Sequence, residues 1–247
     1  VATNETITLP GNEFIRTGYR FIGWATTENG SVEYLDKANY TMGVQESYIL
    51  YAKWEIESYQ LSLTLSDGAA GSVDGAGLKE YNSSVTITVT TNIGYSFAGW
   101  YDENDTLISD LTIYTFTMPA RAVSYQAKWE IESYQLNLTL SDEAAGSVTG
   151  SGKITYKDQV TITATTNTGY TFIGWYDNNN TLISNLATYQ FIMPAIALTY
   201  EARWEANQNT LSFNSNGGEG NMGSILVRTN ETITLPKNTF TRTYYLF

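Results

Sequence analysis

Ile56-Glu57-Ser58-Tyr59-Gln60-Leu61 opens a unit that is written twice in this sequence, at positions 56–130 and again at positions 131–205. The same six residues return at 131–136, and 49 of the 75 aligned positions are identical in the two copies. Self-similarity of this kind is typical of an array of small domains rather than of one large domain. Because the copies follow each other without a gap, we expect residues 56–130 and 131–205 to be two modules with one fold.

Within each unit, apolar and polar residues alternate as they do in half-buried strands. From Tyr59 to Leu65 every second residue is apolar, and in residues 85–90 Val and Ile alternate with Thr. Gly, Asn and Asp clusters separate these segments and indicate turns. No segment shows a convincing amphipathic helical pattern. The sequence therefore predicts a mainly β protein, built from compact and mainly antiparallel sheet modules with room for one short helical turn.

The flanking residues 1–55 and 206–247 are partial copies of a related module. Residues 18–24 read Gly-Tyr-Arg-Phe-Ile-Gly-Trp, and the repeated unit has the same Gly-Tyr-x-Phe-x-Gly-Trp pattern at 94–100. The N-terminal piece is thus the second part of a module, and the C-terminal piece is the first part of another. We predict four domains, at residues 1–55, 56–130, 131–205 and 206–247.

The two end pieces also resemble each other. Residues 227–247 match residues 1–21 at 15 of 21 positions, and residues 209–226 look like the opening hairpin that the N-terminal piece lacks. Two interpretations stay open. The chain is either a fragment with incomplete ends, or the C-terminal piece of one molecule completes the N-terminal piece of the next by head-to-tail strand addition.

The junctions between modules contain neither Gly nor Pro. Residues 54–59 connect the first two modules, and residues 129–134 connect the next two. Flexible linkers are rich in Gly and Ser, so these junctions are expected to hold neighbouring modules at a nearly fixed angle. With modules about 30 Å across by the size scaling of compact domains, we expect an elongated rod.

Composition restricts the chemistry that this chain can perform. It has no Cys and no His, which removes disulfides, thiol nucleophiles, imidazole metal ligands and the commonest general base. The net charge of -12 repels phosphate backbones, so nucleic acid is not an expected partner. No apolar run approaches the roughly 20 residues that a membrane-spanning helix requires. We predict no catalytic residues, no metal or cofactor site and no membrane insertion in this segment.

Three short motifs, taken together, resemble the InlB B-repeat superfamily of bacterial surface proteins. They are the Gly-Tyr-x-Phe-x-Gly-Trp run, a later Met-Pro-Ala and a closing Ala-x-Trp. Residues 1–55 and 207–247 resemble the Listeria-Bacteroides repeat, and residues 56–130 and 131–205 resemble the divergent InlB B-repeat. The resemblance implies β-grasp-like modules in tandem between a ligand-binding region and the cell-wall anchor of exported proteins, without catalytic residues. Tyr244 departs from the motif, which has Gly at 18, 94 and 169, and puts that turn in doubt if it needs a positive φ.

The aromatic run itself has two interpretations. Tyr95, Phe97 and Trp100 are best explained as core residues of a strand, with Gly99 forming a bulge before Trp100. The alternative is an exposed aromatic platform that stacks on sugar rings. We favour the core, because a repeated pair of Trp residues is more often buried.

Other polar motifs also have a structural and a functional interpretation. Residues 102–105 and 177–180 are oxygen-rich loops that suit turns better than calcium, since they lack the Gly and the terminal Glu of an EF-hand. Glu55 and Glu57, which recur as Glu130 and Glu132, are expected to be solvated linker acids rather than a glycosidase pair. Buried Lys residues for isopeptide bonds are not indicated, because Lys79 and Lys153 do not align and Lys53 and Lys128 become Arg203.

Seven glycosylation sequons are expected to be empty in a bacterial protein, because a chain rich in Asn and Thr contains them by chance; they begin at Asn4, Asn39, Asn82, Asn104, Asn137, Asn179 and Asn230.

We therefore predict a non-enzymatic spacer, or stalk, of an extracellular adhesin that is secreted or anchored at the bacterial cell wall. The alternative is a multivalent array whose modules bind host glycan, matrix protein or a further copy of the chain. Three positions assumed to be exposed differ between the copies, which favours the spacer; these pairs are Asp74 and Thr149, Lys79 and Ile154, and Arg121 and Ile196.

Overall fold

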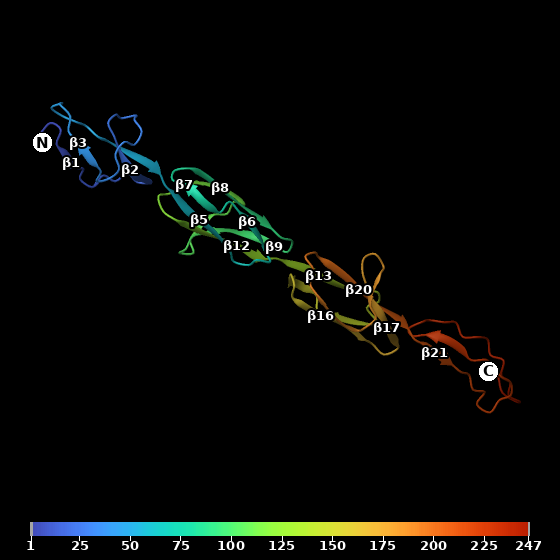
Figure 1. Cartoon of the computed structure of the whole chain (residues 1–247). Coiled ribbons are helices and arrows are strands. Elements are labelled where there is room, and N and C mark those ends of the chain that lie inside the picture. The colour runs from blue at the N-terminus through green and yellow to red at the C-terminus, as the bar shows by residue number, and fades with distance from the viewer. Residues whose placement is uncertain (1, 247) are drawn as a thin grey trace. The chain divides into compact units, whose positions relative to one another are not determined.

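The computed structural model describes residues 2–246 and consists of strands, turns and loops, with no helix among these residues. The chain forms two compact units, residues 1–130 and residues 131–247. Each unit contains small sheets that recur along the chain (Figure 1). The all-β prediction is confirmed, and the helical turn that the sequence left room for is absent from the described residues.

The first unit begins with four strands in two small sheets. β1 pairs with β3 and β2 pairs with β4, both antiparallel. The strands are β1 (Thr6–Thr8), β2 (Tyr19–Ala25), β3 (Asn39–Thr41) and β4 (Tyr51–Ile56). We call residues 2–56 the N-terminal half-module.

Eight further strands complete the first unit and form what we call the first complete module. They make a five-stranded sheet in the order β10-β9-β12-β5-β7 and a three-stranded sheet in the order β11-β8-β6. The strands are β5 (Ser58–Leu65), β6 (Gly71–Asp74), β7 (Gly77–Glu80), β8 (Ser84–Thr91), β9 (Tyr95–Tyr101), β10 (Leu107–Ser109), β11 (Ile113–Thr117) and β12 (Val123–Ile131).

The second unit repeats this arrangement and adds one hairpin. Its second complete module has sheets in the orders β15-β13-β20-β17-β18 and β14-β16-β19, and the C-terminal half-module (residues 206–246) contains the antiparallel pair β21-β22. The strands are β13 (Ser133–Leu140), β14 (Gly146–Thr149), β15 (Gly152–Thr155), β16 (Gln159–Thr166), β17 (Tyr170–Tyr176), β18 (Leu182–Ser184), β19 (Thr188–Ile192), β20 (Leu198–Ala206), β21 (Gln208–Leu211) and β22 (Ile225–Arg228).

Each complete module contains one parallel strand pair in an otherwise antiparallel arrangement. β5 runs parallel to β12 over five residue pairs, from Leu61 with Val123 to Leu65 with Ala127. β13 and β20 pair in the same way. The first and last strands of a module are therefore neighbours, and the rest of the module is the long crossover that a parallel pair needs. The alternating pattern predicts the faces of a strand but not its neighbour, so the sequence did not indicate this pairing.

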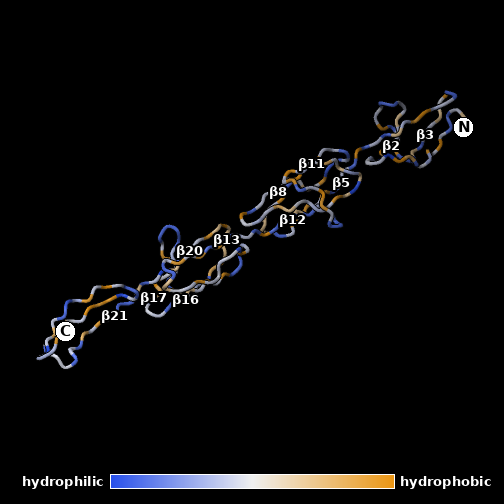
Figure 2. Tube along the Cα trace, turned by 180° about the vertical axis from the view of Figure 1, so that it is seen from behind, coloured by the Kyte–Doolittle hydropathy of each residue, from blue (hydrophilic) through white to orange (hydrophobic). Residues whose placement is uncertain are grey.

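Alternation along the strands packs a separate core into each complete module. Leu61, Ile87, Trp100 and Met118 are fully buried in the first, and their counterparts Leu136, Ile162, Trp175 and Met193 are fully buried in the second. Apolar and polar residues alternate at short intervals along the chain trace (Figure 2). The apolar residues of β5 were expected to face the core, and only Leu65, at the end of the strand, does not do so, since it is 36% exposed.

The glycine before the central Trp opens a bulge, as predicted. The register of β17 against β20 shifts between Phe172 and Gly174, and that of β2 against β4 shifts between Phe21 and Gly23. Gly99, at the same place in the first complete module, has φ of 141°, and a Cβ there would lie 2.4 Å from Leu107 Cδ1. The bulge turns the following Trp100 into the core.

Candidate functional site

The joint between the N-terminal half-module and the first complete module consists of one residue. Glu57 is the single residue between β4 and β5. Its backbone N–H donates to the carbonyl oxygen of Gly18 in the preceding module at 2.9 Å, and its own carbonyl accepts from the N–H of Tyr81 in the following module at 2.8 Å. The ring of Tyr19 meets that of Tyr81 edge-on, with centroids 6.1 Å apart. Both modules therefore bind the backbone of the residue that connects them.

The second unit has an equivalent joint between its complete module and the C-terminal half-module. Asn207 N–H donates to Gly169 O at 2.8 Å, and Asn207 O accepts from Thr229 N–H at 3.0 Å. Asn230 Nδ2 also donates to the hydroxyl oxygen of Tyr170 at 2.9 Å, and Thr171 Oγ1 donates to Asn207 Oδ1 at 2.6 Å. Backbone bonds at both joints are the same although the joining residues differ.

A left-handed residue forms the turn on which each joint rests. Gly18 has φ of 77° and Gly169 has φ of 90°. A Cβ on Gly169 would lie 2.6 Å from Thr229 Cγ2, so both conformation and space favour Gly. Tyr244 takes the same conformation, with φ of 70°, although it is not Gly. The turn that the sequence put in doubt is thus formed, at the cost of placing a bulky residue in a left-handed conformation.

The acidic residues of the junctions have partners, which the sequence did not predict. Tyr59 Oη donates to Glu57 Oε2 at 2.7 Å, and Tyr134 Oη donates to Glu132 Oε2 at 2.6 Å. The bond to Glu57 raises the pKa of the Tyr59 hydroxyl, and desolvation adds to the shift. Glu55 pairs with Arg20. Glu55 is exposed at the surface, as expected for a solvated linker acid, whereas Glu57 and Glu132 are half-buried and each accepts a hydrogen bond from a Tyr hydroxyl.

The oxygen-rich loop after β9 folds as a turn around its first Asp. Asp102 Oδ1 accepts from the N–H groups of Asn104 and Thr106, both at 2.9 Å. These bonds lower the pKa of the Asp102 carboxyl, and the bond from Thr106 contributes most to the shift. Asp177 accepts in the same way from Asn179 and Thr181, and the same cause lowers its pKa. The Asp side chain is thus already used in holding the turn, which supports the interpretation of these loops as turns.

A cation from the last strand of each module contacts this loop. Lys128 pairs with Asp105 and lies 4.4 Å from the centroid of the Tyr101 ring. Arg203 donates to Asn180 and lies 4.2 Å from the centroid of the Tyr176 ring. In the N-terminal half-module, Lys53 Nζ donates to Glu28 O at 3.0 Å. The sequence singled out these three cations only to argue against isopeptide bonds, and the structure gives them a role in tethering the loop.

Phe97 and Trp100 of the aromatic run belong to the core, as predicted, whereas Tyr95 is half-buried. Trp100 and Trp175 are fully buried, and Phe97 packs edge-on against both Trp100 and Trp129. Trp100 Nε1 donates to Leu111 O at 3.1 Å. These buried rings do not form the exposed sugar platform that was the alternative interpretation.

One of the three positions assumed to be exposed is not. Ile154 packs against the core of the second complete module, and its counterpart Lys79 is half-buried. Position 79 therefore says little about surface conservation. At the other two positions the side chains are exposed and do differ, Asp74 against Thr149 and Arg121 against Ile196.

Turn geometry accounts for several of the sequon Asn residues. Asn4, Asn82 and Asn230 have φ of 66°, 62° and 61°. Asn tolerates the left-handed conformation better than most residues, so its presence at these turns has a structural reason. Asn39 and Asn137 lie in strands β3 and β13.

In each half-module, the strand edge that carries the parallel partner in a complete module has no partner among the described residues. β4, the counterpart of β12 and β20, pairs only with β2, and β21, the counterpart of β5 and β13, pairs only with β22. Grooves lie beside these strands. One of about 460 Å³ is lined by Phe14, Ile15, Arg16, Trp24, Leu50, Tyr51, Ala52 and Trp54. Trp24 Nε1 is buried there without a hydrogen-bond partner.

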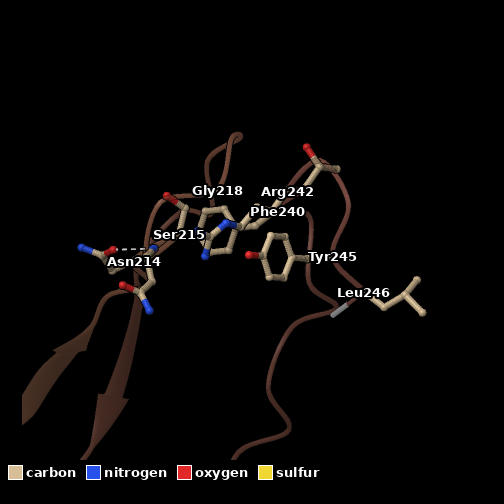
Figure 3. A pocket seen from close by; sticks show the side chains of 9 residues that line it. Asn214, Ser215, Gly218, Phe240, Arg242, Tyr245 and Leu246 are labelled. Atoms are coloured by element: carbon tan, nitrogen blue, oxygen red, sulfur yellow. Dashed lines mark hydrogen bonds between the residues drawn. The ribbon is translucent and has the colours of Figure 1, made fainter.

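In the C-terminal half-module, two grooves adjoin the hairpin. One of about 440 Å³ contains Phe240, Arg242 and Tyr245, while the side chain of Leu246 points away from it and is fully exposed (Figure 3). The other, of about 330 Å³, is lined mainly by apolar residues, among them Phe213, Met222, Leu235 and Phe240. Leu235 is 62% exposed, so the apolar residues of this groove do not form a closed core.

Among residues 2–246 there is no cluster of three or more acidic residues, Cys or His that could hold a metal ion. None of the described residues belongs to a helix long and apolar enough to cross a membrane.

Comparison with protein families gives two matches that together cover most of the chain. Residues 61–133 and 136–208 match the Divergent InlB B-repeat domain. Residues 1–53 and 210–247 match the Listeria-Bacteroides repeat domain. Both families were expected from the sequence motifs.

Similar proteins are found in the bacteria Evansella cellulosilytica and Listeria monocytogenes. A protein of Evansella cellulosilytica named as a Gly-rich membrane protein is 29% identical over 82% of this chain and 24% of its own length. Internalin H of Listeria monocytogenes is 35% identical over 49% of this chain and 21% of its own length. The chain thus spans about a quarter of the curated relatives it matches. A solved structure, the Bacillus anthracis TIE protein, aligns with a TM-score of 0.34 at 11% identity, covering 82% of this chain and 52% of that one.

Proposed function

Because this chain belongs to the divergent InlB B-repeat and Listeria-Bacteroides repeat families of bacterial surface proteins, we propose that it is a non-enzymatic spacer. In this role it carries a binding region away from the cell envelope as the stalk of an adhesin that is secreted or held at the cell wall. Its contribution is geometric, and the modules need no chemistry of their own.

The joint supports this proposal most directly. A spacer must keep its modules from folding back on one another, and a fixed connection does this without a separate stiffening element. At Glu57 and Asn207 both backbone groups of the connecting residue are bonded, one to each neighbour. Rotation about this residue therefore breaks a hydrogen bond to one module or the other, at a cost of about 0.5–1.5 kcal/mol per bond.

Surface variation favours a spacer over a repeated binding face. The two complete modules are identical at most aligned positions, yet they differ at the exposed positions 74 and 149 and at 121 and 196. An array that binds host glycan or matrix protein through each module would be expected to keep the side chains that make contact.

The stiffness of the joint can be measured directly in the full chain. The protein has no Cys, so Asn29→Cys and Asn104→Cys place two spin labels on exposed loops on either side of Glu57. We expect a narrow distribution of label distances by pulsed electron resonance. A matched variant with a short Gly-Ser insertion after Glu57 should broaden it. Equally broad distributions in both proteins would overturn the spacer mechanism.

A second candidate function, self-association, is favoured by the two unpaired strand edges. In each complete module the opening strand pairs in parallel with the closing strand. β21 is an opening strand and β4 is a closing strand, and each has that edge free among the described residues. We propose that β21 of one copy pairs in parallel with β4 of another, and that its apolar hairpin residues fill the groove beside Trp24.

The test uses a residue whose backbone faces the free edge. Asn207 O accepts from Thr229 N–H, so Asn207 is a residue whose backbone faces the strand of β22. In an antiparallel pair, successive residues face the partner strand alternately, so the N–H and C=O of Thr210 face away from β22. We expect light scattering to show concentration-dependent association of the native chain. Thr210→Pro should abolish it and Thr210→Val should keep it. A native chain that stays monomeric at high concentration contradicts the self-association proposal and leaves the spacer untouched.

A further inference from the structure

We infer that each complete module is a load-bearing element whose resistance to stretching resides in the parallel pair of its first and last strands. This inference rests on the proposed spacer role, since a stalk that holds a bound partner is pulled along its chain. It concerns what the modules do under tension, which neither the family nor the fold class specifies.

The direction of the pull follows from the strand pairing. Tension enters the first complete module at Ser58, the start of β5, and leaves it near Glu130, close to the end of β12. The two strands are parallel, so these points lie at opposite ends of the pair. Tension then slides β5 and β12 past each other along their length, and the five residue pairs from Leu61 with Val123 to Leu65 with Ala127 share the load.

The position of this pair in the sheet prevents it from opening gradually. In the order β10-β9-β12-β5-β7, both strands are internal, with β9 on one side and β7 on the other. One bond across the pair, from Ser66 N–H to Ala127 O, is 2.9 Å long. Neither strand can peel from an edge, so resistance depends on breaking several backbone bonds together.

Side chains add to the resistance because both strands contribute to the core. Leu61 of β5 is fully buried, as is Ala127 of β12, and Val123 is 6% exposed. All three belong to the cluster around Trp100. Sliding the strands by one residue would turn each of these side chains toward the opposite face of the sheet, so that slippage and loss of the core occur together.

The N-terminal half-module provides a natural contrast. Within residues 2–246 its closing strand β4 pairs only with β2, and Tyr19 at the start of β2 lies opposite Ile56 at the end of β4. A pull between Tyr19 and Ile56 therefore acts on one end of an antiparallel pair. In such a pair the backbone hydrogen bonds break one after another, so the pair separates at a low force.

The inference is tested by pulling one module of the full chain in two directions. In one variant, Ser58→Cys and Glu130→Cys carry the handles and load the strands lengthwise. In the other, Ser58→Cys and Arg121→Cys place both handles at the same end of the parallel pair, so that the strands are peeled apart. All three attachment residues are exposed, and thermal melting of both variants checks that neither changes the stability without load.

We expect the lengthwise pull to need a severalfold higher unfolding force at the same loading rate. The chain released should be about 22 nm, which is the extended length at ~3.5 Å per residue less the roughly 3 nm between the two handles in the folded module. Equal forces in the two directions would overturn the inference. That result would leave the spacer proposal standing, because the latter depends on the distance distribution across Glu57 and not on force.

Discussion

The complete modules and the half-modules contain the same motif but differ in whether the central Trp of that motif has a hydrogen-bond partner. In the first complete module, Trp100 is fully buried and its Nε1 bonds to Leu111 O. In the N-terminal half-module, Trp24 occupies the same place in the Gly-Tyr-x-Phe-x-Gly-Trp run, and its buried Nε1 has no partner. The local sequence therefore sets the strand, the bulge and the direction of the Trp, whereas a closed core also needs the strands from the other part of the module.

The largest expected effect is on the core of a complete module. Trp100→Ala should destabilise that module by about 3–5 kcal/mol, because a fully buried ring and its hydrogen bond are lost. Trp24→Phe should be close to neutral in the half-module, because it removes an N–H group that has no partner there. Hydrogen exchange followed by mass spectrometry reads each module separately in the full chain. Similar losses at the two sites would remove the distinction between complete and incomplete cores.

A second change tests the joint between a complete module and a half-module. Gly169→Ala places a residue with a side chain at φ of 90°, and its Cβ would lie 2.6 Å from Thr229 Cγ2. We expect it to destabilise the joint by about 1–2 kcal/mol, the cost of a left-handed conformation for a residue with a side chain. Faster exchange of the Asn207 amide is the readout. Gly68→Ala, at a site with nothing within 4 Å of the added Cβ, is the control.

The reverse substitution should stabilise the C-terminal half-module. Tyr244 has φ of 70° and is completely exposed, so its ring contributes little packing while its backbone is in an unfavourable region. Tyr244→Gly is expected to gain about 1 kcal/mol. Slower exchange of residues 239–246 would show it, and a loss of protection would mean that the Tyr side chain has a structural role.

Tethering of the loop by a cation should matter equally in both kinds of module. Lys128→Met removes the pair with Asp105, and Lys53→Met removes the bond to Glu28 O. The Asp105 side chain is 74% exposed, so screening limits the first loss to less than about 1 kcal/mol. Proteolysis of the two loops at matched protease concentrations compares the variants. A large loss in one module alone would show that the tether depends on a complete core.

The smallest expected effect is a dependence on acidity. Hydrogen bonds from Thr106 and Asn104 lower the pKa of Asp102 below its ordinary value of 3.8. The folded module therefore favours the ionised carboxylate, and this stabilisation is present above pH 3.8 and is lost as the pH falls through the lowered pKa. The melting temperature of the native chain should fall relative to that of Asp102→Asn over this window. A difference between the two that does not change with pH would contradict the role of the carboxylate.

The sequence allowed much of the fold to be predicted, for identifiable reasons. Period-two alternation places Leu61 and Ile87 inside, and the repeated Gly before Trp100 indicates a bulge. Both signals are local. The parallel pair of β5 and β12 could not be predicted in this way, because these strands open and close the module and alternation carries no information about neighbours. The prediction of mainly antiparallel sheets is correct apart from this pair and its counterpart, β13 with β20.

The joint could be predicted only in part. The absence of Gly and Pro in residues 54–59 indicates a stiff connection, and the structure adds the two backbone bonds of Glu57. These bonds depend on Gly18 and Tyr81, which belong to different modules and carry no signal for each other in one sequence. The four domain boundaries and the rod-like shape stay predictions.

The backbone character of the joint also bears on how such a gene changes. The connecting residue is Glu57 at one joint and Asn207 at the other, yet each binds its two neighbours through its own N–H and C=O. The backbone bonds of the connection therefore do not require one particular side chain, whereas the contacts of Tyr19 with Tyr81 and of Asn230 with Tyr170 are specific to each joint. Unequal recombination between copies that are identical at most aligned positions would lengthen or shorten the array in whole modules.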